Sequence, residues 1–470
     1  MNLWTQWYGI VETFQWACSR KRTFYFLVLV LVGFTIRPEF LGVTSFIRAL
    51  GIDPLLYKGF LHFFNYSKAL DLLKLTQIWH ALVVSRFPVL QIGPYRTYVV
   101  DGIKIPKEGK KMPGVKKLYQ PSENNSKPAY IRGHSFQAIS ILAGSPENGI
   151  ASIPLISRIQ EGVLSTPRDQ RSQLDRMAKM FLDLVSSIPN PALLVADAYY
   201  ASQSVIRPLL LMGHQLISRL RTNSVAYYPA VPSQKPKRGR PAQYGNKVLL
   251  RQFFDTMQDQ FIKVPSPVYG EADVTISYYT MNLLWRPIGK LVRFVWVIHP
   301  TRGRAMFLCT DLNLDPVVII RAYGYRFKIE VGFRQALYQI GSYAYHFWMR
   351  DMKPRKRNSG TQYLHKESKS YRKMVERKME AYHRFVQLGC IAQGMMQYMS
   401  LVHGQEVWAQ FRSWLRTMKK NQAPSELVVM YAMREGLLEF LSNSPEEDNL
   451  KKILLENMRL PEAKAYHIAA

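Results

Sequence analysis

Three carboxylates are the residues of this sequence best suited to chemistry. Asp101 follows the apolar residues 97–100, Asp197 follows the apolar residues 193–196, and Glu330 lies in a segment with helical spacing. Two divalent ions about 4 Å apart can activate a nucleophilic oxygen and stabilise the leaving oxygen of a phosphodiester. Mg²⁺ prefers oxygen ligands, so Asp and Glu suffice without His or Cys. We therefore predict that Asp101, Asp197 and Glu330 are catalytic and hold two Mg²⁺ ions, with Mn²⁺ as an alternative.

Two further polar residues precede Glu330 at helical spacing. At about 100° per residue, Tyr323, Arg326 and Glu330 fall within roughly 60° of one another on a helix surface. A guanidinium can grip a phosphate with paired donors, and a tyrosine can donate to the next phosphate. Each residue alone could equally have a purely structural role, but the spaced set favours one shared face that contacts DNA.

The elements that must position these side chains follow from the hydrophobic pattern. Three β-rich runs separated by turn residues indicate an antiparallel meander, and the continuous apolar run before Asp197 is typical of a strand covered on both faces. The expected elements are strands at 97–100, 134–142 and 150–159, a helix at 168–185, a strand at 193–196, a helix at 202–211 and a strand at 215–220. The order βββαβαβ predicts an α/β fold.

The interval between Asp197 and Glu330 is far longer than a helix and a strand require. Strand-like runs at 274–278, 291–298 and 305–309 predict a β-rich insertion there, and Asp315 with Pro316 predicts the start of the helical segment that carries Glu330. The predicted domains are a helical N-terminal DNA-binding or accessory domain 1–90, the first part of the catalytic core 91–220, the β-rich insertion 221–312, a core helix segment with Glu330 at 313–350, and a helical C-terminal region 351–470 for dimer and DNA contacts.

The charge balance points to a polyanionic partner. The chain has 63 Lys and Arg against 33 Asp and Glu, a formal charge of +30, so nucleic acid or an anionic membrane is the expected partner, with a merely solvated basic surface as the alternative. Lys104 begins a lysine-rich stretch directly after Asp101, where it could contact a phosphate backbone. Lys237, Arg238 and Arg240 form a tract that resembles a minor-groove hook, unless it is a solvated loop.

The cysteines and the apolar N-terminal run indicate the cellular compartment and whether the protein binds a membrane. Cys18, Cys309 and Cys390 are scattered without disulfide or zinc spacing, which indicates a reducing cytoplasm. The apolar residues 24–34 follow basic residues as in a signal peptide, but the run is too short to span a bilayer. We expect a buried helix and no membrane partner, with a targeting or membrane role as the alternative.

The segment around Glu330 also resembles a known family. Residues 323–337, YGYRFKIEVGFRQAL, are similar to the Tyr-x2-Arg-x3-Glu-x6-Lys signature of bacterial insertion-sequence DDE transposases. Tyr323, Arg326 and Glu330 match, whereas Leu337 stands in place of the final Lys, so the phosphate contact expected there is absent or supplied by Arg334. Residues 98–105, YVVDGIKI, and 193–200, LLVADAYY, resemble the segments that carry the two Asp ligands.

This resemblance implies a fold and an activity. The fold would be a ribonuclease-H-like core, a mixed sheet flanked by helices, interrupted by a β-rich insertion and followed and preceded by helical regions. The activity would be cut-and-paste transposition, in which water nicks a strand end and the freed 3′ hydroxyl attacks another phosphodiester. The implied partners are the terminal inverted repeats of the element and target DNA, bound by a homodimer in a synaptic complex in the bacterial cytoplasm, associated with the nucleoid.

Relatives with this signature also imply a role for a tryptophan in the insertion. A hairpin at the element end would let such a residue stack on a flipped base; Trp296 is the first candidate and Trp285 the second, with ordinary strand packing as the more common role. Two other functions remain open: an inactive or domesticated sequence-specific DNA-binding protein, and a simple metal-dependent nuclease. The presence of all three acids argues against the former, and the insertion and helical flanks argue against the latter.

Overall fold

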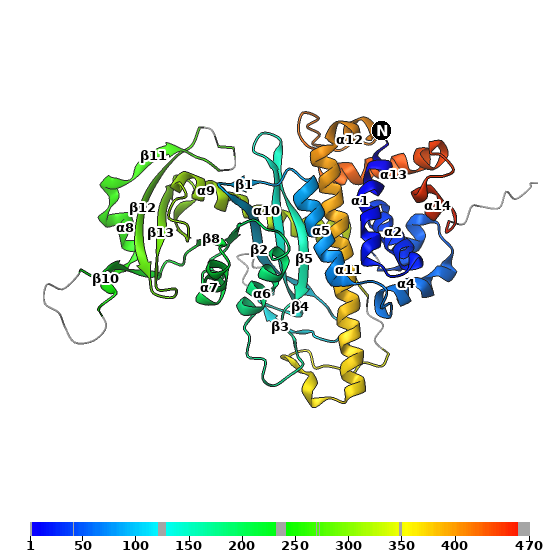
Figure 1. Ribbon diagram of the computed structural model, residues 1–470, viewed down its shortest axis with the longest axis horizontal. Coiled ribbons are helices and arrows are strands. Elements are labelled where there is room, and N and C mark those ends of the chain that lie inside the picture. Colours follow the sequence, from blue (N-terminus) through cyan, green and yellow to red (C-terminus); the bar gives the residue numbers. More distant parts are fainter. Residues whose placement is uncertain are drawn as a thin grey trace, which may run out of the picture.

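The computed structural model of the protein describes residues 2–40, 42–120, 128–231, 241–268, 270–271, 273–346 and 350–458. Within these residues, thirteen strands form one mixed sheet. The middle of the molecule is an α/β core, with the strands β10 to β13 on one side of it and the N- and C-terminal helices on the other (Figure 1). The predicted fold class is confirmed: a mixed sheet with flanking helices and helical terminal regions.

The α/β core, which consists of a sheet and the helices that connect its strands, follows the expected order of elements. Its members are β2 (Tyr95–Pro106), β4 (Tyr130–Ser145), β5 (Gly149–Ile159), α6 (Gln173–Val185), β7 (Ala192–Ala196), α7 (Gln203–Leu211) and β8 (Gln215–Arg219). The first three strands pair antiparallel, β7 lies parallel to β2, and β8 lies parallel to β7. All five residues of β7 are buried, because helices cover both faces of a strand in this central position. Smaller strands are β1 (Gln91–Ile92), β3 (Lys116–Tyr119), β6 (Val163–Leu164) and β15 (Gln362–Tyr363).

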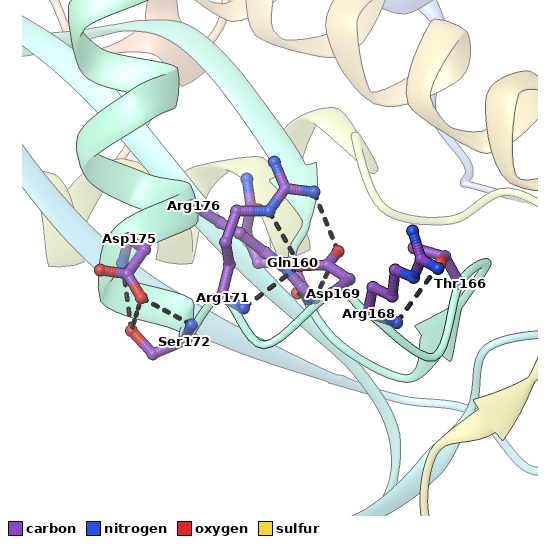
Figure 2. A network of polar contacts seen from close by, with 8 residues as sticks. All are labelled: Gln160, Thr166, Arg168, Asp169, Arg171, Ser172, Asp175 and Arg176. Atoms are coloured by element: carbon purple, nitrogen blue, oxygen red, sulfur yellow. Dashed lines mark hydrogen bonds and ion pairs between the residues drawn. The ribbon is translucent and has the colours of Figure 1, made fainter.

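Helix α6 begins in a polar network that fixes the loop before it (Figure 2). The Ser172 side chain accepts from the Asp175 backbone N–H, and the Asp175 carboxylate accepts from the Ser172 backbone N–H at 2.7 Å, which forms a capping box. In the same loop, the Asp169 carboxylate accepts from Arg171 at 2.8 Å and from Arg176 at 3.1 Å. These contacts fix where α6 starts, and α6 leads the chain into β7.

The expected β-rich insertion is present and extends the core sheet. Its elements are β9 (Val225–Pro229), β10 (Tyr244–Leu249), α8 (Phe253–Thr256), β11 (Ile262–Pro265), β12 (Thr275–Trp285), β13 (Lys290–His299) and β14 (Gly303–Cys309). Strand β14 pairs antiparallel with β8, where Leu308 lies opposite Ser218. The insertion therefore continues the core sheet by hydrogen bonds and does not form a separate sheet.

The helical regions at the two ends of the sequence pack together. They comprise α1 (Leu3–Val11), α2 (Lys21–Ile36), α3 (Thr44–Leu50), α4 (Tyr57–Asn65) and α5 (Leu72–Arg86), then α11 (Lys369–Val402), α12 (Gly404–Gln410), α13 (Glu426–Asn443) and α14 (Asn449–Leu455). The Trp4 indole N–H donates to the carbonyl of Met433 at 2.9 Å, and Arg434 donates to the carbonyl of Ile36 at 2.7 Å. Hydrogen bonds thus join segments nearly 400 residues apart in sequence.

The apolar N-terminal run forms the middle of α2, and its side chains from Phe26 to Phe34 are buried. Among the described residues, no helix combines the length and the apolar character needed to cross a membrane. The remaining helical elements are α9 (Pro316–Tyr325) and α10 (Phe327–Gln335), the π-helical turn η5 (Ala336–Ile340), and the 3-10 turns η1 (Glu12–Ala17), η2 (Pro54–Leu56), η3 (Leu250–Gln252), η4 (Gln258–Gln260) and η6 (Leu364–Lys366).

Candidate active site

Two of the three predicted carboxylates lie on neighbouring parallel strands: Asp101 is in the middle of β2, and Asp197 directly follows β7. In the β2–β7 ladder Val99 pairs with Val195, so two residues further along each strand Asp101 lies opposite Asp197. Side chains alternate along a strand. Val99 and Val195 belong to a hydrophobic cluster that includes Ile319 of α9 and Ile329 of α10, so both aspartates point to the face of the sheet that α9 and α10 cover.

The third carboxylate reaches this face from helix α10. Asp315 caps α9 by accepting from the N–H of Val317 at 2.8 Å, as its position before Pro316 predicts. Helices α9 and α10 meet at Arg326, and α10 packs against β2 and β5. Beyond α10, the buried Arg37 donates to the carbonyls of Ile340 and Gly341. The continuous segment from α9 through η5, which includes Glu330, is therefore held by contacts at both of its ends.

Arg326 joins two of the carboxylates. Its guanidinium donates to Asp101 Oδ2 at 2.8 Å and to Glu330 Oε1 at 2.6 Å. The Arg326 and Asp101 side chains are 13% and 18% exposed, whereas Glu330 is 43% exposed. The backbone N–H of Gly102 donates to Asp101 Oδ1 at 2.8 Å, and that of Tyr199 donates to Asp197 Oδ1 at 2.9 Å. Arg326 therefore links Asp101 to Glu330, and the charge of Asp197 also acts on Asp101.

Burial and neighbouring charges shift the pKa values of Asp101 and Arg326. Burial raises the pKa of Asp101 to about 6; Arg326 and the Gly102 N–H oppose the rise, and the charges of Asp197 and Glu330 add to it. Burial lowers the pKa of Arg326, but the nearby Asp101, Tyr323 and Glu330 outweigh it, so the net pKa lies above its ordinary value. The arginine therefore stays charged among carboxylates that repel one another.

The donor atoms of the site suit a hard divalent cation. All three acids offer carboxylate oxygens, the ligand type that Mg²⁺ and Mn²⁺ favour, and a positive guanidinium already lies between Asp101 and Glu330. Within the described residues, no group of three or more His, Cys, Asp or Glu forms a ready-made metal site. The carboxylate oxygens are therefore suitable ligands for Mg²⁺ or Mn²⁺, and the Arg326 guanidinium already supplies one positive charge between Asp101 and Glu330.

The residues expected to contact phosphate do not form one open face. The Arg326 donors are directed at Asp101 and Glu330, and its contact with phosphate stays a prediction. Tyr323 packs its ring against Phe307 of β14, with ring centroids 4.6 Å apart. Arg326 separates α9 from α10, but its backbone is helical and it still pairs with Glu330 at i,i+4 spacing. Arg334 is exposed on α10, one turn beyond Glu330.

Several lysines in the stretch after Asp101 make hydrogen bonds or ion pairs with other residues of the chain. Lys104 Nζ donates to the carbonyl of Tyr119 at 2.5 Å, and Lys116 pairs with Glu161 at 2.6 Å. Lys107 donates to the carbonyl of Tyr343 at 3.0 Å, and burial lowers the pKa of Lys107 to about 8. The predicted basic residues Lys237, Arg238 and Arg240 lie outside the described residues.

Trp296, the candidate for stacking on a flipped base, is a core residue of the insertion. Its side chain is fully buried, its indole N–H donates to the carbonyl of Leu250 at 2.7 Å, and its ring stacks on Phe253 with centroids 4.7 Å apart. The reason is that η3 and α8, which carry Leu250 and Phe253, pack on this face of β13. Trp285 is also buried. The expectation of base stacking by Trp296 is therefore corrected to packing.

Two neighbours of the site escaped the sequence reasoning. Tyr200 is buried and its hydroxyl donates to Gln137 Oε1, and Gln137 lies opposite Gly102 in the β2–β4 ladder. A Cβ on Gly102 would come within 2.9 Å of Gln137 Nε2. Burial, followed by the charges of Asp101 and Asp197, raises the pKa of Tyr200 well above its ordinary value. A glutamine within a strand gives no sequence signal of such a contact.

Comparison with known proteins finds a family model that matches part of the chain. Residues 43–268 match the family model described as DDE superfamily endonuclease, just under half of the chain. The match includes Asp101 and Asp197 and ends before Glu330. No curated protein matches the chain. The chain thus contains a DDE superfamily endonuclease domain, which implies hydrolysis of phosphodiester bonds with DNA as the substrate.

Proposed function

We propose that the protein is a DDE transposase that cuts an insertion sequence out of one DNA site and joins it to another. The observation that carries the proposal is the pair of ion pairs from Arg326 to Asp101 and Glu330, where Asp101 lies on a strand whose parallel neighbour is followed by Asp197. The endonuclease match and the formal charge of +30 support the same class of substrate. The similarity of residues 323–337 to the transposase signature narrows the proposed activity to transposition.

In this proposal the three acids hold two Mg²⁺ ions, which Mn²⁺ can replace. When bound, these ions would supply a reactive water and stabilise the leaving 3′ oxygen. The chain itself fixes the carboxylates: the strand register sets Asp101 beside Asp197, and α10 brings Glu330 over them. Arg334, exposed beside Glu330, is available for the phosphate contact that Leu337 cannot make, since Leu337 packs against the hydrophobic core.

The proposed partners are the terminal inverted repeats of the element and the target duplex, bound by two copies of the chain in the bacterial cytoplasm. Two copies are proposed because both element ends must be cut and joined together. The basic residues 237–240 and the exposed Arg334 are proposed to contact DNA. Contacts of this kind make affinity depend on salt, since each phosphate neutralised releases counterions.

The test uses the full chain, DNA that carries the flanks of its gene, and a supercoiled plasmid as target. With Mg²⁺, the expected products are 3′ hydroxyl ends cut at an inverted repeat and plasmid joined to those ends. Asp101→Asn, Asp197→Asn and Glu330→Gln should each reduce cutting about 10³-fold or more, roughly 4 kcal/mol, and remain folded. Cutting without joining would indicate a simple nuclease, and binding without cutting would indicate a DNA-binding protein.

A further inference from the structure

Two tyrosines are exposed together on a ribbon that extends from the site. Tyr119 of β3 and Tyr130 of β4 lie directly opposite each other, with ring centroids 5.3 Å apart. Their side chains are 57% and 53% exposed. Strand β3 is an edge strand, so the described strands leave one side of this pair uncovered. Two large aromatic rings kept in water this close together indicate a surface that contacts a partner.

Lysines surround the pair. Lys117 Nζ lies 4.4 Å from the centre of the Tyr130 ring, and Lys104 Nζ donates to the carbonyl of Tyr119 at 2.5 Å. In the described part of the chain, neighbouring Lys116 pairs with Glu161, but no salt bridge joins Lys104 or Lys117 to a carboxylate. The surface therefore combines aromatic rings with positive charges that have no acidic partner there, which suits a polyanion with flat apolar groups.

The ribbon starts at the candidate active site. Asp101 pairs with Ala138, and along β4 the pairing continues through Gly133 opposite Pro106. At about 3.3 Å per residue, Tyr130 lies roughly 25 Å from Ala138 along the strand. A DNA strand that leaves the carboxylates along this ribbon would reach the tyrosines within a few nucleotides.

We propose that Tyr119 and Tyr130, with Lys104 and Lys117, form a binding site for unpaired DNA. The proposal rests on the proposed function and names where one strand lies after the duplex ends have opened. Unpaired bases expose the flat faces that stack on aromatic rings, whereas duplex DNA hides them, and the lysines contact the adjacent phosphates. This surface would stack on unpaired bases, which the buried Trp296 cannot do.

The binding test uses the full chain in EDTA, so its result does not depend on cleavage. The probes are fluorescein-labelled oligo(dT) and a labelled duplex of the same length, followed by fluorescence anisotropy. Tyr119→Ala with Tyr130→Ala should weaken oligo(dT) binding about tenfold or more and change duplex binding less than about twofold. Tyr119→Phe with Tyr130→Phe should keep the affinity, since the rings remain.

Tyr66→Ala is the matched control. Tyr66 is also 53% exposed, and Arg377 lies over its ring at 4.4 Å, but it follows α4 in the helical region. Its removal should leave oligo(dT) binding unchanged. An equal loss in the control would mean that any exposed tyrosine matters and would overturn the proposal. Unchanged oligo(dT) affinity in the double alanine variant, or an equal loss on duplex, would overturn it too.

A second measurement avoids variants altogether. Oligo(dT) that contains 5-iododeoxyuridine is crosslinked by light to the wild-type chain, and the modified peptide is identified by mass spectrometry. Crosslinks at Tyr119 or Tyr130 are expected, and crosslinks only elsewhere would refute the site. If these crosslinks form but wild-type protein never cuts DNA with Mg²⁺, the proposed function fails while the binding site stands.

Discussion

Arg326 provides the sharpest test of the electrostatics at the site. In Arg326→Gln, Asp101 loses its ion pair while it stays largely buried, and Glu330 loses an exposed i,i+4 pair. A charged hydrogen bond to a buried group contributes about 1.5–3 kcal/mol, and the exposed pair adds about 0.3–0.5 kcal/mol. We therefore expect the variant to lose about 2–3 kcal/mol of folding free energy in low salt with EDTA.

The assay is thermal unfolding followed by circular dichroism. For a chain of this length a loss of 1 kcal/mol lowers the Tm by about 1 °C, so a fall of about 2–3 °C is expected. Adding Asp101→Asn to Arg326→Gln should restore most of it, since a neutral amide needs no cation. Mg²⁺ should raise the Tm of Arg326→Gln more than that of the wild type, because a divalent ion would replace the lost charge.

Two results would refute this reasoning. If Arg326→Gln unfolds at the wild-type temperature in EDTA, the guanidinium does not stabilise the carboxylates. If Mg²⁺ raises the Tm of the single variant no more than that of the double variant, the ion does not bind between these acids. Arg334→Gln is the matched control, since Arg334 is an exposed arginine of the same helix; its Tm should change by less than about 0.5 °C.

Three further predictions concern stability and binding. Burial lowers the pKa of His80 to about 4, so between pH 6.5 and 4 the unfolded chain binds a proton that the folded chain does not. The contribution of neutral His80 to the free energy of unfolding is therefore fully present above pH 6.5, and about 3 kcal/mol of it is lost by pH 4. The Tm of His80→Gln should fall less than that of the wild type across this range. Trp296→Ala should cost about 3–5 kcal/mol of stability, read by urea unfolding, because it empties a core position; a variant that loses only DNA affinity would contradict its burial. DNA affinity measured by anisotropy should fall steeply as salt rises, and a flat dependence would exclude phosphate contacts as its source.

The sequence by itself determined the local features of this protein. The apolar runs before Asp101 and Asp197 predicted β2 and β7, because a covered strand must be apolar along its length. Asp315 and Pro316 predicted the start of α9, because capping depends only on neighbouring residues. The long interval before Glu330 predicted the insertion. Each of these signals lies within a few residues of the element that it specifies.

Only the tertiary structure decided what the side chains contact. Arg326 bonds to Asp101 across 225 positions of sequence, and no local pattern could show this ion pair. A strand tryptophan has the same sequence pattern whether it is open or covered, so the burial of Trp296 depended on the packing of η3 and α8 against β13. The exposure of Tyr119 and Tyr130 likewise follows from β3 lying at the sheet edge. Burial and long-range pairing arise from the packing of distant segments, which composition and spacing do not encode.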